Sequence, residues 1–295
     1  MKAFKLLFAG MLYTVVITAC AQQHSNQISR ELSFADASAQ NLLYLANING
    51  NVSVEGYSGN KVVLEAKRTV KGRKAEWVEQ GKQEIDLEVL EAEDSIVVYI
   101  KHPCNAFPGK GRWNEKRWTG YQWNKDCDFD YDFNFDFTIK VPYQTNLFIS
   151  TINDGDVNIK EVKGEVEAKN INGGIFISGI SGRTDVHTIN GDVVLDYARN
   201  PTDDSKFYTL NGDIKANFRQ GLSANMSFKS FNGEFYTNIQ QLEYLPTKVE
   251  KYEGDKGKGV KYKIGDKSRV KVRNGGTRLD FETFNGDVYV KEVSN

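Results

Sequence analysis

Thr188-Ile189-Asn190-Gly191-Asp192-Val193 is one copy of a short pattern that returns along the chain. Each copy has an aliphatic or aromatic residue, then Asn-Gly, a mostly acidic residue and a hydrophobic residue, and the copy at Asn153 is a variant with one extra residue, Asp154, before the glycine. The asparagines of the copies are Asn49, Asn153, Asn172, Asn190, Asn211, Asn232 and Asn285. From Asn153 they are spaced by 19, 18, 21 and 21 residues, and then by 53 to Asn285. The second half of the chain is therefore built from repeats of about 20 residues.

Residue types alternate on both sides of each Asn-Gly pair, which predicts two half-buried strands per repeat. One set of equivalent positions is hydroxylated or amidic: Thr151, Asn170, Thr188, Thr209, Ser230 and Thr283. An antiparallel meander or sandwich would also alternate in this way. Because the same residue type recurs in consecutive repeats, the pattern favours an all-β solenoid, with like residues stacked about 4.8 Å apart.

The Asn-Gly pairs and the acidic residues after them have a structural and a functional interpretation. Asn tolerates the left-handed backbone conformation, and its amide can bond along a stack, so we expect the seven asparagines to be structural. The acidic column is Asp156, Asp192, Asp213, Glu234 and Asp287. Stacked carboxylates repel and could bind Ca²⁺, or each could support its own turn in solvent. We expect the second, and hence no metal and no cofactor.

The first twenty residues have the features of an export signal. Lys2 and Lys5 are followed by an apolar run that is too short for a confident transmembrane helix. The run ends at Ile17-Thr18-Ala19-Cys20, which resembles the lipobox of bacterial lipoproteins. A plain signal peptide with an incidental cysteine is the alternative. We expect Cys20 to be lipidated and to hold the mature chain on a membrane.

Four regions follow from these patterns. Residues 1–19 are the signal peptide, and residues 20–40 are polar and predict a tether. Residues 41–145 predict an irregular β-rich region with one short helix, at 73–82, and a Trp-rich insertion at 103–127. Residues 146–295 hold the solenoid repeats, interrupted at about 240–276 by a charged, hairpin-like insertion.

Cys104 and Cys127 remain once Cys20 is assigned to the lipid. Disulfides persist in exported proteins, so a bridge between them is favoured over two free thiols. Such a bridge would stabilise the fold by about 3 kcal/mol in the chain-entropy model.

The segment between these cysteines contains Trp113, Trp118, Tyr121 and Trp123 among several lysines and arginines. Exposed Trp and Arg are typical of binding anchors, whereas a cluster that packs the loop onto the body is the alternative. Residues 128–137 alternate aromatic with acidic or amide residues, which predicts a strand with five rings on one face.

Several function classes lack support in the sequence. A formal net charge of −1 gives no electrostatic basis for binding nucleic acid. Only three histidines are present, and no nucleophile elbow, phosphate loop or zinc-protease motif occurs. We therefore expect no catalytic residues and no enzymatic activity, although carboxylates could still meet in space as in a glycosidase or polysaccharide lyase.

The repeated T-x-N-G-D-V pattern and the preceding segment from Lys140 to Leu147 resemble the putative adhesin family. This domain of unassigned function is common in lipoproteins of the bacterial envelope, and the resemblance covers about residues 40–295. It implies a β-helical or β-roll fold and an envelope location, with the outer membrane as the expected site, facing the periplasm or the cell surface. It supplies no catalytic residue.

These observations predict a lipid-anchored, non-enzymatic envelope protein that acts in adhesion or surface interaction. Its expected partners are the membrane, through the lipid, and a surface glycan or protein. One alternative is a glycan-binding or carbohydrate-active protein that uses the Trp-rich loop. Another is a structural element that assembles through the ends of the stack. The oligomeric state is left open by the sequence.

Overall fold

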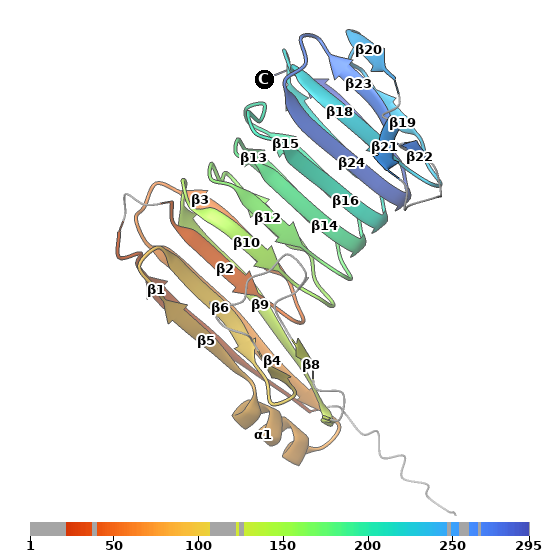
Figure 1. Ribbon diagram of the computed structural model, residues 1–295. Helices are drawn as coiled ribbons and strands as arrows, with labels where there is room; N and C mark the ends of the chain where they lie inside the picture. Colours follow the sequence, from red (N-terminus) through yellow and green to blue (C-terminus); the bar gives the residue numbers. More distant parts are fainter. Residues whose placement is uncertain are drawn as a thin grey trace, which may run out of the picture.

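The computed structural model describes residues 22–36, 40–106, 122–123, 127–246, 249–253, 260–264 and 267–294. Within them the chain is all-β with one helix, α1 (Ala75–Glu84). Two large mixed sheets run side by side along the molecule, with two short two-stranded sheets beside them (Figure 1).

The larger sheets are called here sheet A and sheet B. In spatial order, sheet A consists of β1 (Gln22–Leu32), β4 (Val62–Gly72), β9 (Tyr131–Pro142), β3 (Val52–Tyr57), β11 (Val157–Lys160), β13 (Ile175–Ile180), β15 (Val193–Tyr197), β17 (Ile214–Arg219), β25 (Val288–Val293) and β19 (Phe235–Thr237). Sheet B consists of β20 (Leu242–Leu245), β23 (Ser268–Val272), β18 (Ala224–Lys229), β24 (Thr277–Asn285), β16 (Ser205–Asn211), β14 (Thr184–Asn190), β12 (Val166–Lys169), β10 (Asn146–Ser150), β2 (Leu42–Ala46), β6 (Ser95–Lys101) and β5 (Asp86–Glu91). The small sheets pair β7 (Asn105–Ala106) with β8 (Gln122–Trp123), and β21 (Val249–Glu253) with β22 (Val260–Ile264).

Each repeat contributes one strand to sheet B and the next to sheet A, and the Asn-Gly pair lies at the corner between them. We call this unit a coil. The coils are β2–β3, β10–β11, β12–β13, β14–β15, β16–β17, β24–β25 and β18–β19. Neighbouring coils pair in parallel in both sheets, with Val157 opposite Ile175, Ile175 opposite Val193 and Val193 opposite Ile214. An antiparallel meander is therefore excluded for the coils.

The hydrophobic core lies between the two sheets and runs along the stack. It is formed by the inward residues of every strand, because alternate side chains of a strand point to opposite faces. Val157, Ile175, Val193, Ile214 and Val288 are at most 1% exposed. The strand predicted from the alternating aromatic residues 128–137 also buries alternate side chains in the core. In β9, Tyr131, Phe133, Phe135 and Phe137 are buried and the alternate Asp132 is exposed.

Buried hydroxyl groups link one coil to the next at the corner. Thr188 Oγ1 donates to the carbonyl of Gly173 at 2.8 Å, and Thr209 Oγ1 donates to that of Gly191 at 2.8 Å. Equivalent bonds of 2.9 to 3.1 Å are made by Thr151, Asn170, Ser230 and Thr283. A buried hydroxyl must be bonded to avoid a desolvation penalty, so the recurrence of Thr or Ser at this position has a physical cause.

Glycine at the corner is required by the approach of its neighbour. A Cβ built on Gly173 would overlap the carbonyl oxygen of Gly155, and one built on Gly191 would overlap that of Gly173. Asparagine does not supply the left-handed conformation that the sequence suggested. Among described residues, the non-glycine positions with positive φ are Asp154, Glu161 and Arg273, so that expectation for the asparagines is wrong.

The predicted tether at 20–40 is wrong for part of its length, because Gln22–Leu32 forms β1. This polar strand pairs antiparallel with β4 over all eleven residues, from Gln22 opposite Gly72 to Leu32 opposite Val62. Hydrogen bonds between backbones do not require apolar side chains, so composition alone did not reveal it. Residues 1–21, with Cys20, lie outside the described residues. No described helix is long and apolar enough to span a membrane.

The last coil does not follow the preceding ones in chain order. β24 lies between β16 and β18 (Figure 1). In sheet A, β25 lies between β17 and β19. The insertion before it forms the hairpin β21–β22, while β20 and β23 extend sheet B beyond β18 by antiparallel pairing. In the sequence, Asn285 follows Asn232 after a gap of 53 residues. In the structure it lies between Asn211 and Asn232.

Replacing Gly173 by Ala should destabilise the protein by about 1–3 kcal/mol, because the methyl group overlaps the Gly155 carbonyl. The matched control is Gly174→Ala. There a Cβ meets the ring of Phe176, which is 37% exposed and can turn aside, and it comes only to 3.3 Å from the carbonyl oxygen of Asp192, so a smaller loss than in Gly173→Ala is expected. Urea unfolding measures both free energies. Equal losses in the two variants would contradict the role assigned to the corner glycine.

Candidate functional site

The seven repeat asparagines form one continuous ladder along the corner. Each Nδ2 donates to the Oδ1 of the preceding coil in the order Asn49, Asn153, Asn172, Asn190, Asn211, Asn285, Asn232, over distances of 2.7 to 3.2 Å. At the first coil, Asn49 Nδ2 donates to the carbonyl of Phe133 at 2.9 Å. The amides therefore bond along the stack, and they hold the corner in register.

The acidic column also bonds from coil to coil. Asp192 Oδ1 accepts the backbone N–H of Asp213 at 2.9 Å, and Asp213 Oδ1 accepts that of Asp287 at 3.0 Å. Asp156 and Asp287 accept the N–H groups of Gly174 and Glu234 in the same way. Each of these four carboxylates thus satisfies a corner amide of its neighbour, which gives them a structural role.

Repulsion within this column is reduced by neighbouring groups. Lys215 Nζ lies 3.2 Å from Oδ2 of both Asp192 and Asp213. The hydroxyl of Tyr289 donates to Asp287 Oδ2 at 3.0 Å, and this bond raises the pKa of the phenol. No group of three His, Cys, Asp or Glu side chains that could hold a metal ion occurs among the described residues.

Exposed aromatic side chains gather on the last two coils of the stack. Before each Asn lies an aliphatic residue that is half-buried in most coils, as Ile171, Ile189 and Leu210 are. In the last two coils this position holds Phe284 and Phe231, which are 44% and 74% exposed. Their rings stack with centroids 4.8 Å apart and an interplanar angle of 4°.

A second stacked pair lies on the sheet A side of the same two coils. The rings of Tyr236 and Tyr289 have centroids 5.0 Å apart and an interplanar angle of 12°. We call Phe231, Phe284, Tyr236 and Tyr289 the aromatic corner. Exposed large apolar side chains that cluster are typical of contact surfaces. The change from Ile or Leu to Phe at the position before Asn-Gly is the feature of the sequence that marks the aromatic corner. The sequence-based prediction of contact residues did not include it.

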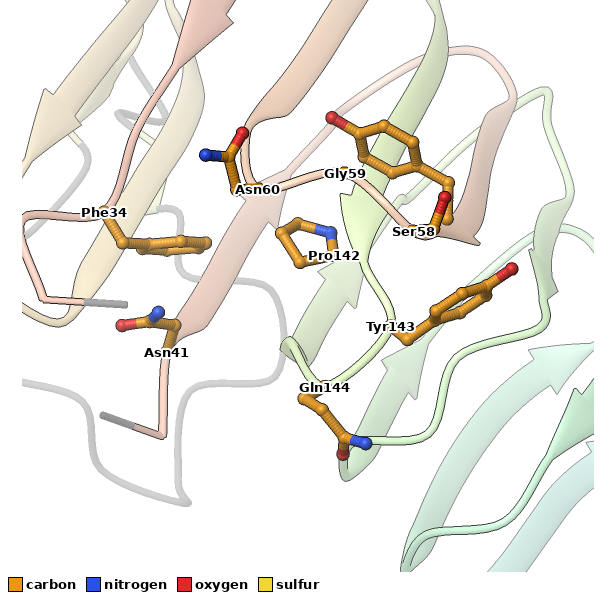
Figure 2. A pocket seen from close by; sticks show the side chains of 9 residues that line it. Phe34, Asn41, Ser58, Gly59, Asn60, Pro142, Tyr143 and Gln144 are labelled. Carbon is orange, nitrogen blue, oxygen red and sulfur yellow. The ribbon is translucent and has the colours of Figure 1, made fainter. Parts of the chain in front are cut away.

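A shallow hollow of about 290 Å³ lies at the other ends of the strands, where β3 and β9 end and β2 and β10 begin. Phe34, Tyr57, Pro142 and Tyr143 supply its apolar lining, and Asn41 and Gln144 reach its rim (Figure 2). The Tyr57 hydroxyl donates to the carbonyl of Lys61 at 2.8 Å. None of the lining residues is charged, and Ser58 supplies a hydroxyl group.

Of the predicted disulfide and Trp-rich loop residues, the structure describes only some. Cys104 and Cys127, the pair expected to be bridged, form a disulfide with a Cα–Cα distance of 5.3 Å. Trp113, Trp118 and Tyr121 lie outside the described residues. Trp123 belongs to β8, whose backbone pairs with β7. The predicted contact of these four side chains therefore lies outside the described residues.

His187 and His102 have surroundings that do not suit a general base. The ring of His187 lies 3.9 Å from that of Tyr208 on the outer face of sheet B, and burial followed by the charge of Lys169 lowers its pKa to about 4. His102 is buried, and its Nδ1 accepts the backbone N–H of Cys104 at 3.0 Å. General bases work best with a pKa near the working pH, and burial lowers the pKa of both imidazoles.

Comparison with known proteins gives little further identification. No family model and no curated protein matches the chain. One solved structure that matches is a putative cell adhesion protein from Clostridium sporogenes ATCC 15579, with 10% identity and a TM-score of 0.38, covering 92% of this chain and all of that one. Another is a putative adhesin from Bacteroides fragilis NCTC 9343, with 12% identity and a TM-score of 0.32, covering 91% and 97%. Both names agree with the adhesin resemblance, but these scores are too low to assign a fold or a function.

Replacing Asp213 by Ala should cost about 1–3 kcal/mol, because the backbone N–H of Asp287 loses its acceptor. Asp213→Asn keeps an acceptor oxygen and should cost less. Asp203→Ala is the control, since this exposed carboxylate accepts only from the neighbouring Thr202 hydroxyl. Thermal unfolding with and without EDTA measures the effects, and EDTA should leave the midpoint unchanged. A Ca²⁺-dependent rise in midpoint that disappears in Asp213→Asn would instead identify the column as a cation site.

Proposed function

We propose that this chain is a lipid-anchored, non-enzymatic protein of the bacterial envelope, and that its body is a β-solenoid acting in adhesion or surface interaction. The parallel, in-register pairing of seven coils in two sheets supports the solenoid. The lipobox-like Ile17–Cys20 and the Cys104–Cys127 disulfide support export and anchoring. The body then presents its surface to other molecules.

The observation that carries the interaction role is the aromatic corner. Phe231 exposes 74% of its surface, although burying a phenylalanine is favourable by about 1.5–3 kcal/mol. The neighbouring Phe284, stacked against it, extends the apolar surface across two coils. Aromatic side chains that cluster on a rigid scaffold are preferred anchors of binding interfaces.

Cys20→Ala should move the protein from the membrane fraction to the soluble periplasmic fraction, because the thiol that carries the lipid is removed. Ala19→Gly is the matched control, since it keeps a small residue before the cysteine and should leave the protein on the membrane. Fractionation followed by immunoblotting measures the distribution. Retention of Cys20→Ala on carbonate-washed membranes would contradict the anchor.

Phe231→Ser combined with Phe284→Ser should weaken binding of the purified chain to intact cells, or to glycans on an array, by about tenfold or more, as expected for anchor residues. Phe176→Ser is the control, because Phe176 is also exposed but lies on β13, away from the last two coils. Replacing Trp113, Trp118 and Trp123 by Ala tests the glycan-binding alternative in the same assay. Loss of binding in the Trp variant with full binding in the Phe variant would assign contact to the Trp-rich loop instead.

A further inference from the structure

The last coil occupies a slot between two coils that are consecutive in the chain. β16–β17 and β18–β19 carry Asn211 and Asn232, which are 21 residues apart, the usual spacing for direct neighbours. β24 and β25 nevertheless separate them in both sheets. Both walls of the slot come from residues that precede the last coil in the sequence, and the slot is filled by a segment that follows them.

The corner and core contacts of the last coil are of the kind made throughout the stack. Thr283 Oγ1 donates to the carbonyl of Gly212, and Ser230 Oγ donates to the carbonyl of Gly286. Asn285 continues the amide ladder on both sides, to Asn211 and to Asn232. In the core, the ring of Phe281 lies 4.8 Å from that of Phe207 and 5.2 Å from that of Phe228. The slot thus recognises a coil with this pattern, whichever chain supplies it.

The connection into the slot is short and carries backbone strain. β23 pairs antiparallel with one side of β18, and β24 pairs parallel with its other side, so residues 273–276 must cross over β18. Arg273 has a φ of 50°, which an L-residue adopts at a cost, and Gly275 and Gly276 also have positive φ. Short strained hinges favour exchange of the segment that they connect.

One ion pair closes the last coil onto this connection. The guanidinium of Arg273 bonds both carboxylate oxygens of Glu292 at 2.7 and 2.8 Å, and it also bonds the carbonyl of Leu222. Glu292 in turn accepts the backbone N–H of Leu222 at 2.9 Å. In an exchanged pair the same bonds form between the Glu292 of one molecule and the Arg273 of the other, so none is lost.

We propose that two copies of this chain exchange their C-terminal coils, each filling the slot of the other with residues 277–293. The slot is filled by a coil that carries Phe, Thr, Asn-Gly and an acidic residue at the spacing found in β24–β25. A second copy of this chain supplies a coil with this same pattern, so it is the partner. Exchange keeps the ladder, core and ion-pair contacts and relieves the hinge at Arg273. The interface is reciprocal, and it closes as a twofold dimer.

The test uses Tyr208 and Glu282, which are opposite each other on the outer face of sheet B. Neighbouring strands lie about 4.8 Å apart, within the Cα–Cα range of about 4.4–6.8 Å that a disulfide spans. Tyr208→Cys and Glu282→Cys are made separately in the mature chain with Cys20→Ala, where Cys104 and Cys127 are already bridged. The two proteins are mixed at high concentration, incubated and oxidised, and dimers are resolved on a non-reducing gel.

A disulfide-linked dimer should form in the mixture, increase with concentration and incubation time, and be several-fold more abundant than in either protein alone. The double variant Tyr208→Cys, Glu282→Cys at low concentration should close the bond within one chain. Absence of the mixed dimer, while the double variant closes, would overturn the exchange.

A second pair tests the order of the coils. Tyr208→Cys with Lys229→Cys in one chain should not cross-link, because β24 lies between β16 and β18. Cross-linking of this pair would mean that the two coils stack directly and that no slot exists, which overturns the proposal. None of these measurements depends on the lipid anchor, so failure of the anchor and failure of the exchange are distinguishable.

Discussion

Close approach of the corner glycines is the constraint on which the rest of the stack depends. Six corner glycines, from Gly155 to Gly286 and Gly233, face the backbone of the glycine in the neighbouring coil so closely that a Cβ would overlap it. This approach brings the Gly carbonyls within reach of a side chain from the next coil, a Thr or Ser hydroxyl in most coils and the Asn170 amide at Gly155. It also brings asparagine amides and acidic side chains to hydrogen-bonding distance of their equivalents. Three hydrogen-bonded columns therefore share one geometric cause.

These columns explain why polar residues recur in a protein that is held together by its core. Buried hydroxyl groups and corner N–H groups would be unsatisfied in a single coil, and each finds its partner only in a neighbour. An isolated coil is therefore unfavourable, while a stack gains both core burial and satisfied polar groups with every addition. The carboxylates belong to this system, since four of them accept a backbone N–H of the adjacent coil.

The coils are alike at the positions that hold the stack together, and they differ at exposed positions on the surface. Positions that face the ladders or the core are nearly fixed in type, whereas the position before Asn changes from Ile171 and Ile189 to Phe284 and Phe231. That change places exposed aromatic rings on the last two coils, against a backbone that the ladders make rigid. The proposed contact role and the proposed exchange concern the same pair of coils, yet they use opposite surfaces: the outer aromatic rings for one and the inner repeat contacts for the other.

The sequence by itself determined the strand content, the corner at each Asn-Gly and the residues that face inward, because period-two alternation and the spacing of about 20 residues depend on local geometry. The predicted helix at 73–82 is displaced by two residues from the observed α1. Only the tertiary structure decided the order of the coils. Since every coil presents the same columns, Asn285 fits next to Asn211 as well as Asn232 does, and the pattern cannot distinguish them. The docking of Gln22–Leu32 as β1 was likewise decided by backbone pairing with β4, which polar side chains neither require nor prevent.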